Sequence, residues 1–327
     1  MYENLRTGVI GVGSMGQNHA RIYSEISNLV AVADPDAEQG RKIADKFGIK
    51  WYEDYNQMLE NIDAVTIAVP TILHRTVAEA AIARGVHVLV EKPLAGNTED
   101  AKAIVEAAKN AGLVLAVGHV ERHNEVVSKT KDLISKGKIG EILTLSAMRF
   151  SSYPFRIRDV GVLFDLAIHD VDLLLYLANS DIKMVFAAGG KSKNDIHEDH
   201  INLQLIFENG KIGFCETNWL TPMKVRQLNI TTTSCYLNVD HITQQIKILS
   251  STYDEVDESN LYKTPMQVTE KNISVKAKEP LYNELVDFLS SIEENTEPLV
   301  SGSDGLKAVR IVEAALKSLN EKSVVRL

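Results

Sequence analysis

The sequence predicts an α/β protein with two domains: a doubly wound parallel sheet in residues 1–120, and an α+β domain with a large, open, mainly antiparallel sheet in residues 121–327. The 327 residues exceed the roughly 100 to 200 of one ordinary domain. The first 118 residues alternate short β-branched runs with helical stretches that end at glycine. After His119, strand patterns follow one another directly, with turn signals between them.

The first domain is predicted to repeat a strand–helix unit, as a parallel sheet with crossover helices requires. Glycine ends a helix easily because it tolerates the left-handed conformation of the C-cap. The predicted strands are Val9–Val12, Leu29–Asp34, Ala64–Val69, Val86–Val90 and Leu113–Val117, and the helices are Gln17–Glu25, one ending at Gly48, Thr76–Arg84 and Glu99–Asn110. Five buried strands would therefore form one doubly wound sheet.

The second domain is predicted to contain consecutive strands, with Asn209-Gly210 as a tight hairpin turn. The strands are Ile142–Phe150, Met184–Ala188, Ile201–Glu208, Lys211–Trp219, Gln227–Thr233 and Tyr236–Val239, and the helices are Glu125–Ser135, Val162–Leu177, Leu281–Ile292 and Gly305–Leu319. As an alternative, the last predicted helix packs back on the first domain. The open face of such a sheet predicts a homodimer or homotetramer, because large apolar faces seldom stay bare.

The composition excludes several classes of protein. With 45% hydrophobic and 24% charged residues, the chain is neither disordered nor a disulfide scaffold. A formal charge of −9 disfavours nonspecific binding to nucleic acid or anionic lipid. Cys215 and Cys235 form no CxxC or zinc spacing. No apolar run approaches the about 18 residues of a membrane span, and no signal peptide is evident. We therefore expect a cytoplasmic protein without membrane partners.

A glycine motif, Gly11-Val12-Gly13-Ser14-Met15-Gly16, lies between the first predicted strand and the first predicted helix. In this context a GxGxxG motif binds a dinucleotide, because its glycines allow a tight turn, close approach of the pyrophosphate and helix packing. Asp34 ends the next strand, where a carboxylate accepts the ribose hydroxyls of NAD and repels the 2′-phosphate of NADP. One alternative is a glycine-rich turn without a ligand. The other is NADP binding, in which Arg41 and Lys42 would offset the repulsion between Asp34 and the 2′-phosphate.

Lys92 follows the fourth predicted strand, within Glu91-Lys92-Pro93. Ligands of doubly wound folds bind at this carboxyl edge of the sheet. Pro93 biases Lys92 toward extended geometry, which would aim the ammonium group into the crevice. A surface lysine is the alternative.

A nearly all-apolar helix carries Asp165 and His169, four residues apart on one face, with Asp172 one turn further along. A carboxylate beside a buried imidazole raises its basicity and orients it, as a general base requires. Asp170 points elsewhere and is expected only to cap or pair. A core Asp–His pair is the alternative, while a metal site would need a third convergent ligand.

Weaker candidates surround these residues. His197-Glu198-Asp199-His200 resembles a metal-ligand run, but we expect a solvated start of a strand because neighbours alternate faces. The third predicted strand is followed by Pro70, Thr71 and His74. We expect these residues either to contact the nicotinamide half of the cofactor or only to cap a helix. Glu121 and Arg122, followed by His123, contact substrate or form a hinge. Arg156 and Arg158 suit a diphosphate or carboxylate, or a surface salt bridge.

Together these motifs resemble the Gfo/Idh/MocA family of sugar and cyclitol dehydrogenases over nearly the whole chain. The motifs in family order are Gly11–Gly16, Pro70–His74, Glu91-Lys92-Pro93, Gly118-His119, Asp165…His169…Asp172 and Pro298–Gly302. The resemblance implies a Rossmann domain and NAD-dependent oxidation of a ring hydroxyl to a ketone. It also implies a catalytic role for Lys92, Asp165 and His169.

Within the family, four segments resemble the branch of UDP-N-acetylglucosamine 3-dehydrogenases and related nucleotide-sugar oxidoreductases: Val117–Arg122, Arg156–Gly161, Asp165–Asp172 and Asn218–Pro222. This implies that C3 of UDP-N-acetylglucosamine is oxidised. His123 departs from the pattern, since family members commonly carry Phe or Tyr there. In the mechanism implied, His169 takes the hydroxyl proton, Asp165 orients the imidazole, and Lys92 hydrogen-bonds the developing ketone or is itself the base. The alternatives are an inositol or free-aldose dehydrogenase of the same family, and a non-catalytic NAD-binding regulator.

Overall fold

The computed structural model describes residues 1–154, 160–193, 195–253, 259 and 266–327. The chain divides into two compact units. The first contains residues 1–123 and 279–313, and the second contains residues 124–278 and 314–327. Residues 279–313, which sequence analysis assigned to the second domain, thus belong to the first unit.

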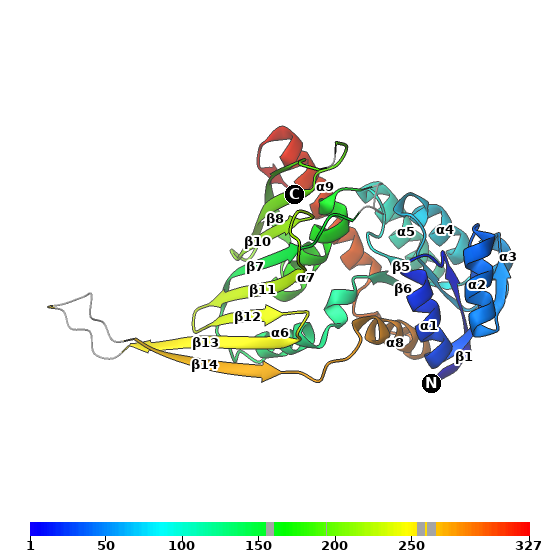
Figure 1. The fold of residues 1–327 in the computed structure, drawn as a ribbon, viewed down its shortest axis with the longest axis horizontal. Coiled ribbons are helices and arrows are strands. Elements are labelled where there is room, and N and C mark those ends of the chain that lie inside the picture. Colours follow the sequence, from blue (N-terminus) through cyan, green and yellow to red (C-terminus); the bar gives the residue numbers. More distant parts are fainter. Residues whose placement is uncertain (155–159, 194, 254–258, 260–265) are drawn as a thin grey trace. The chain divides into compact units, whose positions relative to one another are not determined.

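The first unit is built on a parallel sheet with strand order β3-β2-β1-β4-β5-β6 in the described chain (Figure 1). Its elements are β1 (Tyr2–Ile10), α1 (Gly16–Ile26), β2 (Ser27–Ala33), α2 (Ala37–Phe47), β3 (Lys50–Tyr52), α3 (Tyr55–Leu59), β4 (Ala64–Ile67), η1 (Thr71–Leu73), α4 (His74–Ile82), β5 (His87–Glu91), α5 (Thr98–Ala111), β6 (Leu115–Gly118), η2 (Val120–His123), α8 (Pro280–Glu294) and the first part of α9 (Gly302–Glu321), whose residues from 314 on belong to the second unit. The order reverses between β1 and β4, which confirms the doubly wound sheet.

One strand of this sheet was not predicted. The count of five strands is wrong because β3 adds a sixth, pairing with β2 through Ala31 and Lys50. Three residues are too few to show a hydrophobic period. The predicted helix ends at Gly48 and Gly112 are confirmed, each in the left-handed region with φ near 68° and 66°.

Helices α1 and α8 lie side by side and complete one core. Ile22, Tyr23 and Ile26 of α1 belong to the same hydrophobic cluster as Leu285 and Phe288 of α8. All five are buried at 2% exposure or less. A segment late in the chain therefore closes the core around the first helix.

The second unit is built on a sheet of nine described strands in the order β14-β13-β12-β11-β7-β10-β9-β8-β15. Its elements are α6 (Glu125–Ser135), β7 (Ile142–Phe150), a π-helical turn η3 (Leu163–Ala167), α7 (Ile168–Ala178), β8 (Ile182–Gly190), β9 (His200–Phe207), β10 (Ile212–Asn218), β11 (Val225–Thr232), β12 (Tyr236–Asp240), β13 (Gln245–Tyr253), β14 (Met266–Ser274) and β15 (Val325–Arg326). Neighbours pair antiparallel except β7 and β10, so the mainly antiparallel sheet is confirmed.

Strands β13 and β14 were not predicted, although they pair over nine positions and extend beyond their neighbours (Figure 1). Strand β14 is exposed along almost its whole length. Without a buried face, its sequence carries no alternating hydrophobic pattern to detect. Among the described helices, none combines the length and the apolar character that a membrane crossing requires.

Candidate functional site

The glycine loop after β1 has the geometry of a dinucleotide cradle. Gly11 has φ near +83°, and a Cβ there would lie 2.7 Å from the Ala68 carbonyl oxygen. A Cβ on Gly16 would lie 1.8 Å from the Gly11 oxygen, so the helix could not approach the strand. At Gly13, by contrast, no described atom would lie within 4 Å of an added Cβ. The loop therefore fits an NAD-type cofactor, with open space where a pyrophosphate would approach the backbone.

Asp34 lies one residue beyond β2 and organises this loop. Its Oδ2 accepts the Val12 N–H at 2.8 Å, and its Oδ1 accepts the Asp36 N–H at 2.9 Å. Each carboxylate oxygen retains a further lone pair for a ribose hydroxyl. Gln39, which sequence analysis missed, donates from Nε2 to the Val12 oxygen at 2.7 Å. The Arg41 guanidinium carbon lies 4.9 Å from the centre of the Trp51 ring, in a cation–π contact.

The segment after β4 contains Pro70, Thr71 and His74. Pro70 is exposed, Thr71 is half-buried, and His74 is only 1% exposed. The His74 ring spans two loops, with Nδ1 2.8 Å from the Pro93 oxygen and Nε2 2.9 Å from the Val69 oxygen. Burial lowers the pKa of His74, although these two hydrogen bonds oppose that shift. His74 thus ties the segments after β4 and β5 together, while the Thr71 side chain is more exposed than that of His74.

Glu91 ends β5, and its carboxylate turns into the unit rather than toward solvent, at 8% exposure. Oε1 lies 2.8 Å from Nε2 of His19 on α1, and Oε2 accepts the Lys92 N–H at 3.1 Å. Burial raises the pKa of Glu91, but its interactions with His19 and Lys92 outweigh burial, and the pKa lies below its usual value. The peptide between Lys92 and Pro93 is cis. His19 was not predicted as a site residue, although a histidine within the apolar stripe of α1 is a usable signal.

In the second unit, a π-helical turn precedes α7 and carries Asp165. His169 lies in the first turn of α7; both side chains are half-buried, whereas Asp172 is fully buried. Asp170 accepts a hydrogen bond from Nε of Arg149 at 2.8 Å within a buried ion pair, which confirms the expected pairing role. Short π segments often occur at functional sites, because the extra residue rotates the side chains that follow.

Glu198 and Asp199 are buried at 7% and 0% exposure, so the expected solvated start of β9 is wrong. The Glu198 Oε1 accepts the Leu163 N–H at 3.0 Å, and its backbone oxygen accepts the Val162 N–H at 3.0 Å. A Cβ on Gly161 would lie 2.1 Å from that Oε1. These contacts anchor the π turn that carries Asp165. The sequence does not reveal this role of Glu198, because strand alternation says nothing about a distant partner.

Asp199 has a separate structural role. Its Oδ2 accepts the N–H groups of Ser192 and Lys193 at 2.7 and 2.5 Å, and its Oδ1 lies 2.8 Å from Nδ1 of His200. These bonds satisfy the buried carboxylate within the loop before β9. In the described part of the chain, no three His, Cys, Asp or Glu side chains come together as metal ligands.

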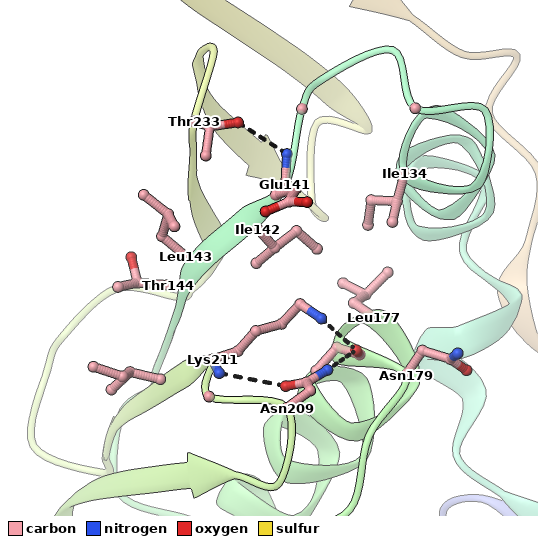
Figure 2. Close-up of a pocket in the computed structure, with 15 residues that line it drawn as sticks. Ile134, Glu141, Ile142, Leu143, Thr144, Leu177, Asn179, Asn209, Lys211 and Thr233 are labelled. Carbon is pink, nitrogen blue, oxygen red and sulfur yellow. Dashed lines mark hydrogen bonds between the residues drawn. The ribbon is translucent and has the colours of Figure 1, made fainter.

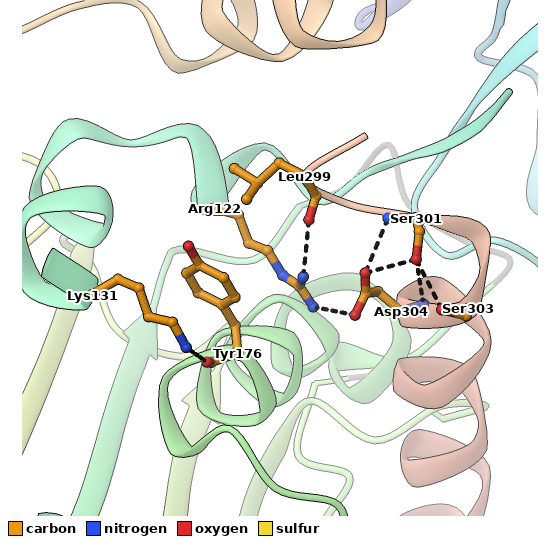
Figure 3. A network of polar contacts seen from close by, with 7 residues as sticks. All are labelled: Arg122, Lys131, Tyr176, Leu299, Ser301, Ser303 and Asp304. Atoms are coloured by element: carbon orange, nitrogen blue, oxygen red, sulfur yellow. Dashed lines mark hydrogen bonds and ion pairs between the residues drawn. The ribbon is translucent and has the colours of Figure 1, made fainter. Parts of the chain in front are cut away.

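Arg122 lies in η2 of the first unit and is only 3% exposed. Its Nη1 donates to the Leu299 oxygen at 3.3 Å, and its Nη2 lies 3.2 Å from Oδ1 of Asp304 (Figure 3). Asp304 in turn accepts the Ser301 N–H at 3.0 Å. The guanidinium thus ties η2 to the start of α9.

The two neighbours of Arg122 differ in exposure: Glu121 is half-buried, whereas His123 is buried. Burial, and then the charge of Arg122, lowers the pKa of His123 to about 4. Arg156 and Arg158 lie outside the described residues.

A broad groove of about 1290 Å³ in the second unit is lined by the ends of α6, α7 and β7 and by the β9–β10 turn. Figure 2 shows Ile142 and Leu177 beside it, with Lys211 and Asn209 donating to the Ala178 oxygen at 3.2 Å each. None of the predicted site residues is among the described side chains that line it. The groove is therefore separate from the candidate site.

Comparisons with known proteins identify the family. A model described as the oxidoreductase family with an NAD-binding Rossmann fold matches residues 5–119, and one described as the Gfo/Idh/MocA C-terminal domain matches residues 127–237. UDP-N-acetylglucosamine 3-dehydrogenase of Acidithiobacillus ferrooxidans is 30% identical over 96% of both chains. Its solved structure superposes with a TM-score of 0.87 at 28% identity, covering 97% of this chain and 98% of that one.

Myo-inositol 2-dehydrogenase of Thermotoga maritima is 27% identical over 99% of this chain and 98% of its own. The resemblance stated from the motifs is confirmed, as is the Rossmann architecture of the first unit. The chain belongs to the Gfo/Idh/MocA family of NAD-binding oxidoreductases.

Proposed function

We propose that this oxidoreductase uses NAD to oxidise the C3 hydroxyl of UDP-N-acetylglucosamine to a ketone. The observation that carries the substrate is the 30% identity, over 96% of both chains, to a UDP-N-acetylglucosamine 3-dehydrogenase. The open Gly13 backbone and the Asp34 carboxylate support the choice of cofactor. Asp34 favours NAD over NADP because a carboxylate repels a 2′-phosphate.

Oxidation of an alcohol removes one proton from oxygen and one hydride from carbon. Bound NAD supplies the acceptor for the hydride. His169 accepts the hydroxyl proton, and Asp165 orients the imidazole for that transfer. Lys92 hydrogen-bonds the oxygen as it becomes a ketone, or takes the proton directly. Arg122 lies in a buried ion pair, so we propose that it supports the site from behind while Glu121 contacts the sugar.

The test is to mix the protein with NAD and UDP-N-acetylglucosamine, with inositol and free N-acetylglucosamine in parallel. Both the absorbance of reduced nicotinamide and the mass of the sugar are followed, because tightly held NADH would hide turnover. A product two hydrogens lighter from the UDP-sugar alone is expected. If a control sugar is oxidised and UDP-N-acetylglucosamine is not, the proposed substrate is wrong, while the proposed class of reaction stands.

An inositol dehydrogenase is the second candidate, favoured by the 27% identity to myo-inositol 2-dehydrogenase over nearly the whole of both chains. This candidate predicts that a sugar or cyclitol without the UDP group is oxidised at least as fast as the UDP-sugar. A non-catalytic NAD-binding regulator is the third, and turnover of any sugar would exclude it.

We also propose that the protein works as a homodimer or homotetramer in a reducing compartment such as the cytoplasm. Both cysteines are free thiols. On the open face of the second sheet, Phe186 and Phe214 both lie opposite Gln204 in register, and each is more than one-third exposed. Such aromatic side chains suit burial against a second copy.

A further inference from the structure

A buried cluster in the first unit lies directly behind the backbone of Lys92. His19 of α1 contacts Glu91 of β5, and Glu284 of α8 is buried close enough for the charge of Glu91 to act on it. We propose that Glu91 is the single anion of this cluster and fixes the Lys92 backbone, with His19 as its hydrogen-bond donor and Glu284 as a neutral acid facing it. The catalytic importance of Lys92 rests on the proposed function, whereas the charge state of the cluster does not.

The Glu91 carboxylate occupies a prepared position. Its two oxygens are divided between the His19 ring at 2.8 Å and the Lys92 N–H at 3.1 Å. On the next strand, β6, a Cβ on Gly118 would lie 2.9 Å from Oε2. Any larger residue at Gly118 would therefore press on the oxygen that holds Lys92. The carboxylate sets where the chain leaves β5, and hence where the Lys92 side chain begins.

His19 is fully buried, and its two ring nitrogens have different surroundings. Nε2 faces the Glu91 carboxylate, while Nδ1 has no hydrogen-bond partner among the described residues. Nε2 is therefore the ring nitrogen that donates to the Glu91 carboxylate.

Glu284 is only 2% exposed, and neither carboxyl oxygen has a hydrogen-bond partner in the described part of the chain. Burial, then the charges of Glu91 and Asp287, raise its pKa well above the usual value. Two buried carboxyl groups whose surroundings push their pKa values apart hold one proton between them. Glu284 therefore carries the proton, and Glu91 remains ionised.

Of the charged groups on the elements packed around the cluster, Lys92 lowers the pKa of Glu91 and Asp287 raises that of Glu284, so both favour a charge on Glu91 and a proton on Glu284. Burial raises the pKa of Tyr23 of α1, whose hydroxyl lies 2.8 Å from the Thr66 hydroxyl. The remaining titratable or charged groups are His74 of α4, and Arg122 and His123 of η2.

The protonation of Glu284 is tested by thermal unfolding without cofactor across pH. The folded state holds a proton that the unfolded state has lost once the pH exceeds the ordinary carboxyl pKa. Stability therefore falls as pH rises from there toward the folded pKa, and Glu284→Gln removes this loss. The Tm difference between Glu284→Gln and wild type should grow from about pH 5 to about pH 8.

The matched control is Glu294→Gln, an exposed residue of the same helix, for which the Tm difference should stay constant with pH. A constant or shrinking difference for Glu284→Gln would mean that Glu284 is ionised in the fold, and would overturn its part of the proposal.

The link from His19 through Glu91 to Lys92 is tested with protein labelled with ¹⁵N-lysine, again without cofactor. Both Glu91→Gln and His19→Leu should shift the Lys92 amide resonance. The first removes the anionic acceptor of the Lys92 N–H, and the second removes the ring that orients that acceptor. His19→Gln, which keeps a donor, and Glu284→Gln should shift it far less. An unmoved resonance in Glu91→Gln would overturn the link.

Turnover gives a second readout of this link. In Glu91→Gln and His19→Leu, kcat should fall about tenfold to a hundredfold, the cost of a small misplacement of a reacting group. KM should change little, and His19→Gln should restore most of kcat. Equal losses in His19→Gln and His19→Leu would show that the ring serves only packing. If wild type oxidises no sugar, the proposed function fails, while the unfolding and resonance results still decide the cluster.

Discussion

Lys92 combines a fixed backbone with a position at the carboxyl edge of the first sheet. We expect Lys92→Ala to lower kcat about 10²- to 10⁴-fold, the usual contribution of a positioned acid or base. NADH affinity should change little, because the glycine loop and Asp34 are untouched. Steady-state kinetics and NADH fluorescence titration measure the two effects. Near-normal turnover in this variant would refute the role of Lys92, and Lys92→Arg tests whether charge alone suffices.

Asp34 determines the choice between cofactors if its oxygens receive the ribose. Asp34→Asn should weaken NADH binding about tenfold to a hundredfold, since hydrogen bonds to a charged group contribute roughly 1.5 to 3 kcal/mol. It should also reduce the ratio by which the protein binds NADH more tightly than NADPH. Titration with both dinucleotides measures this. Asp45→Asn, at an exposed position of α2, is the matched control. An unchanged ratio of the two affinities would count against the ribose assignment.

At this scale, the sequence predicts residues whose role depends on near neighbours. The glycine loop and Asp34 lie within one strand–helix–strand unit, so the motif itself contains their context. His19, Gln39 and Glu198 depend on partners that are distant in sequence or set by the exact path of a loop. Burial of Glu198 was predicted wrongly for this reason, because the Leu163 N–H that satisfies it is 35 residues away.

At the scale of elements, the start of α7 depends on the space beside Gly161. Gly161→Ala would place a methyl group 2.1 Å from the Glu198 Oε1 and push the carboxylate off the Leu163 N–H. We expect a loss of about 1 to 3 kcal/mol in the free energy of unfolding, measured by denaturant titration. Turnover should fall as well, because Leu163 begins the π turn that carries Asp165.

Gly96→Ala is the control, since no described atom would lie within 4 Å of its Cβ. Adding Glu198→Ala to Gly161→Ala should cost less than the sum of the two single changes, because the clash disappears. Strict additivity would show that the contact is not the cause.

Elements with a clear hydrophobic period were predicted well. The predicted bounds of α6 and β7 coincide with the structure, since both have a buried face along their length. The helix over Val162–Leu177 was predicted as one regular element, whereas its first turn is a π helix. Hydrophobic pattern does not distinguish the two when nearly every residue is apolar.

At the scale of the whole molecule, the open sheet face predicts self-association. Light scattering after size exclusion should show a dimer or tetramer. Phe214→Asp should shift the population toward a smaller species, because it places a charge in the aromatic part of that face. Ile242→Asp, at an exposed turn after β12, should leave the assembly unchanged. A monomeric wild type would refute the proposal.

The first unit draws its core from both ends of the chain, and this orders its assembly during synthesis. Domains of a growing chain generally fold as they emerge from the ribosome, N-terminal first. Here Ile22, Tyr23 and Ile26 meet Leu285 and Phe288 only after the intervening second unit has been made. Until α8 is translated, the part of the α1 surface that packs against α8 stays uncovered. The nascent chain therefore carries an exposed hydrophobic patch through most of its translation, which is a natural binding site for a chaperone.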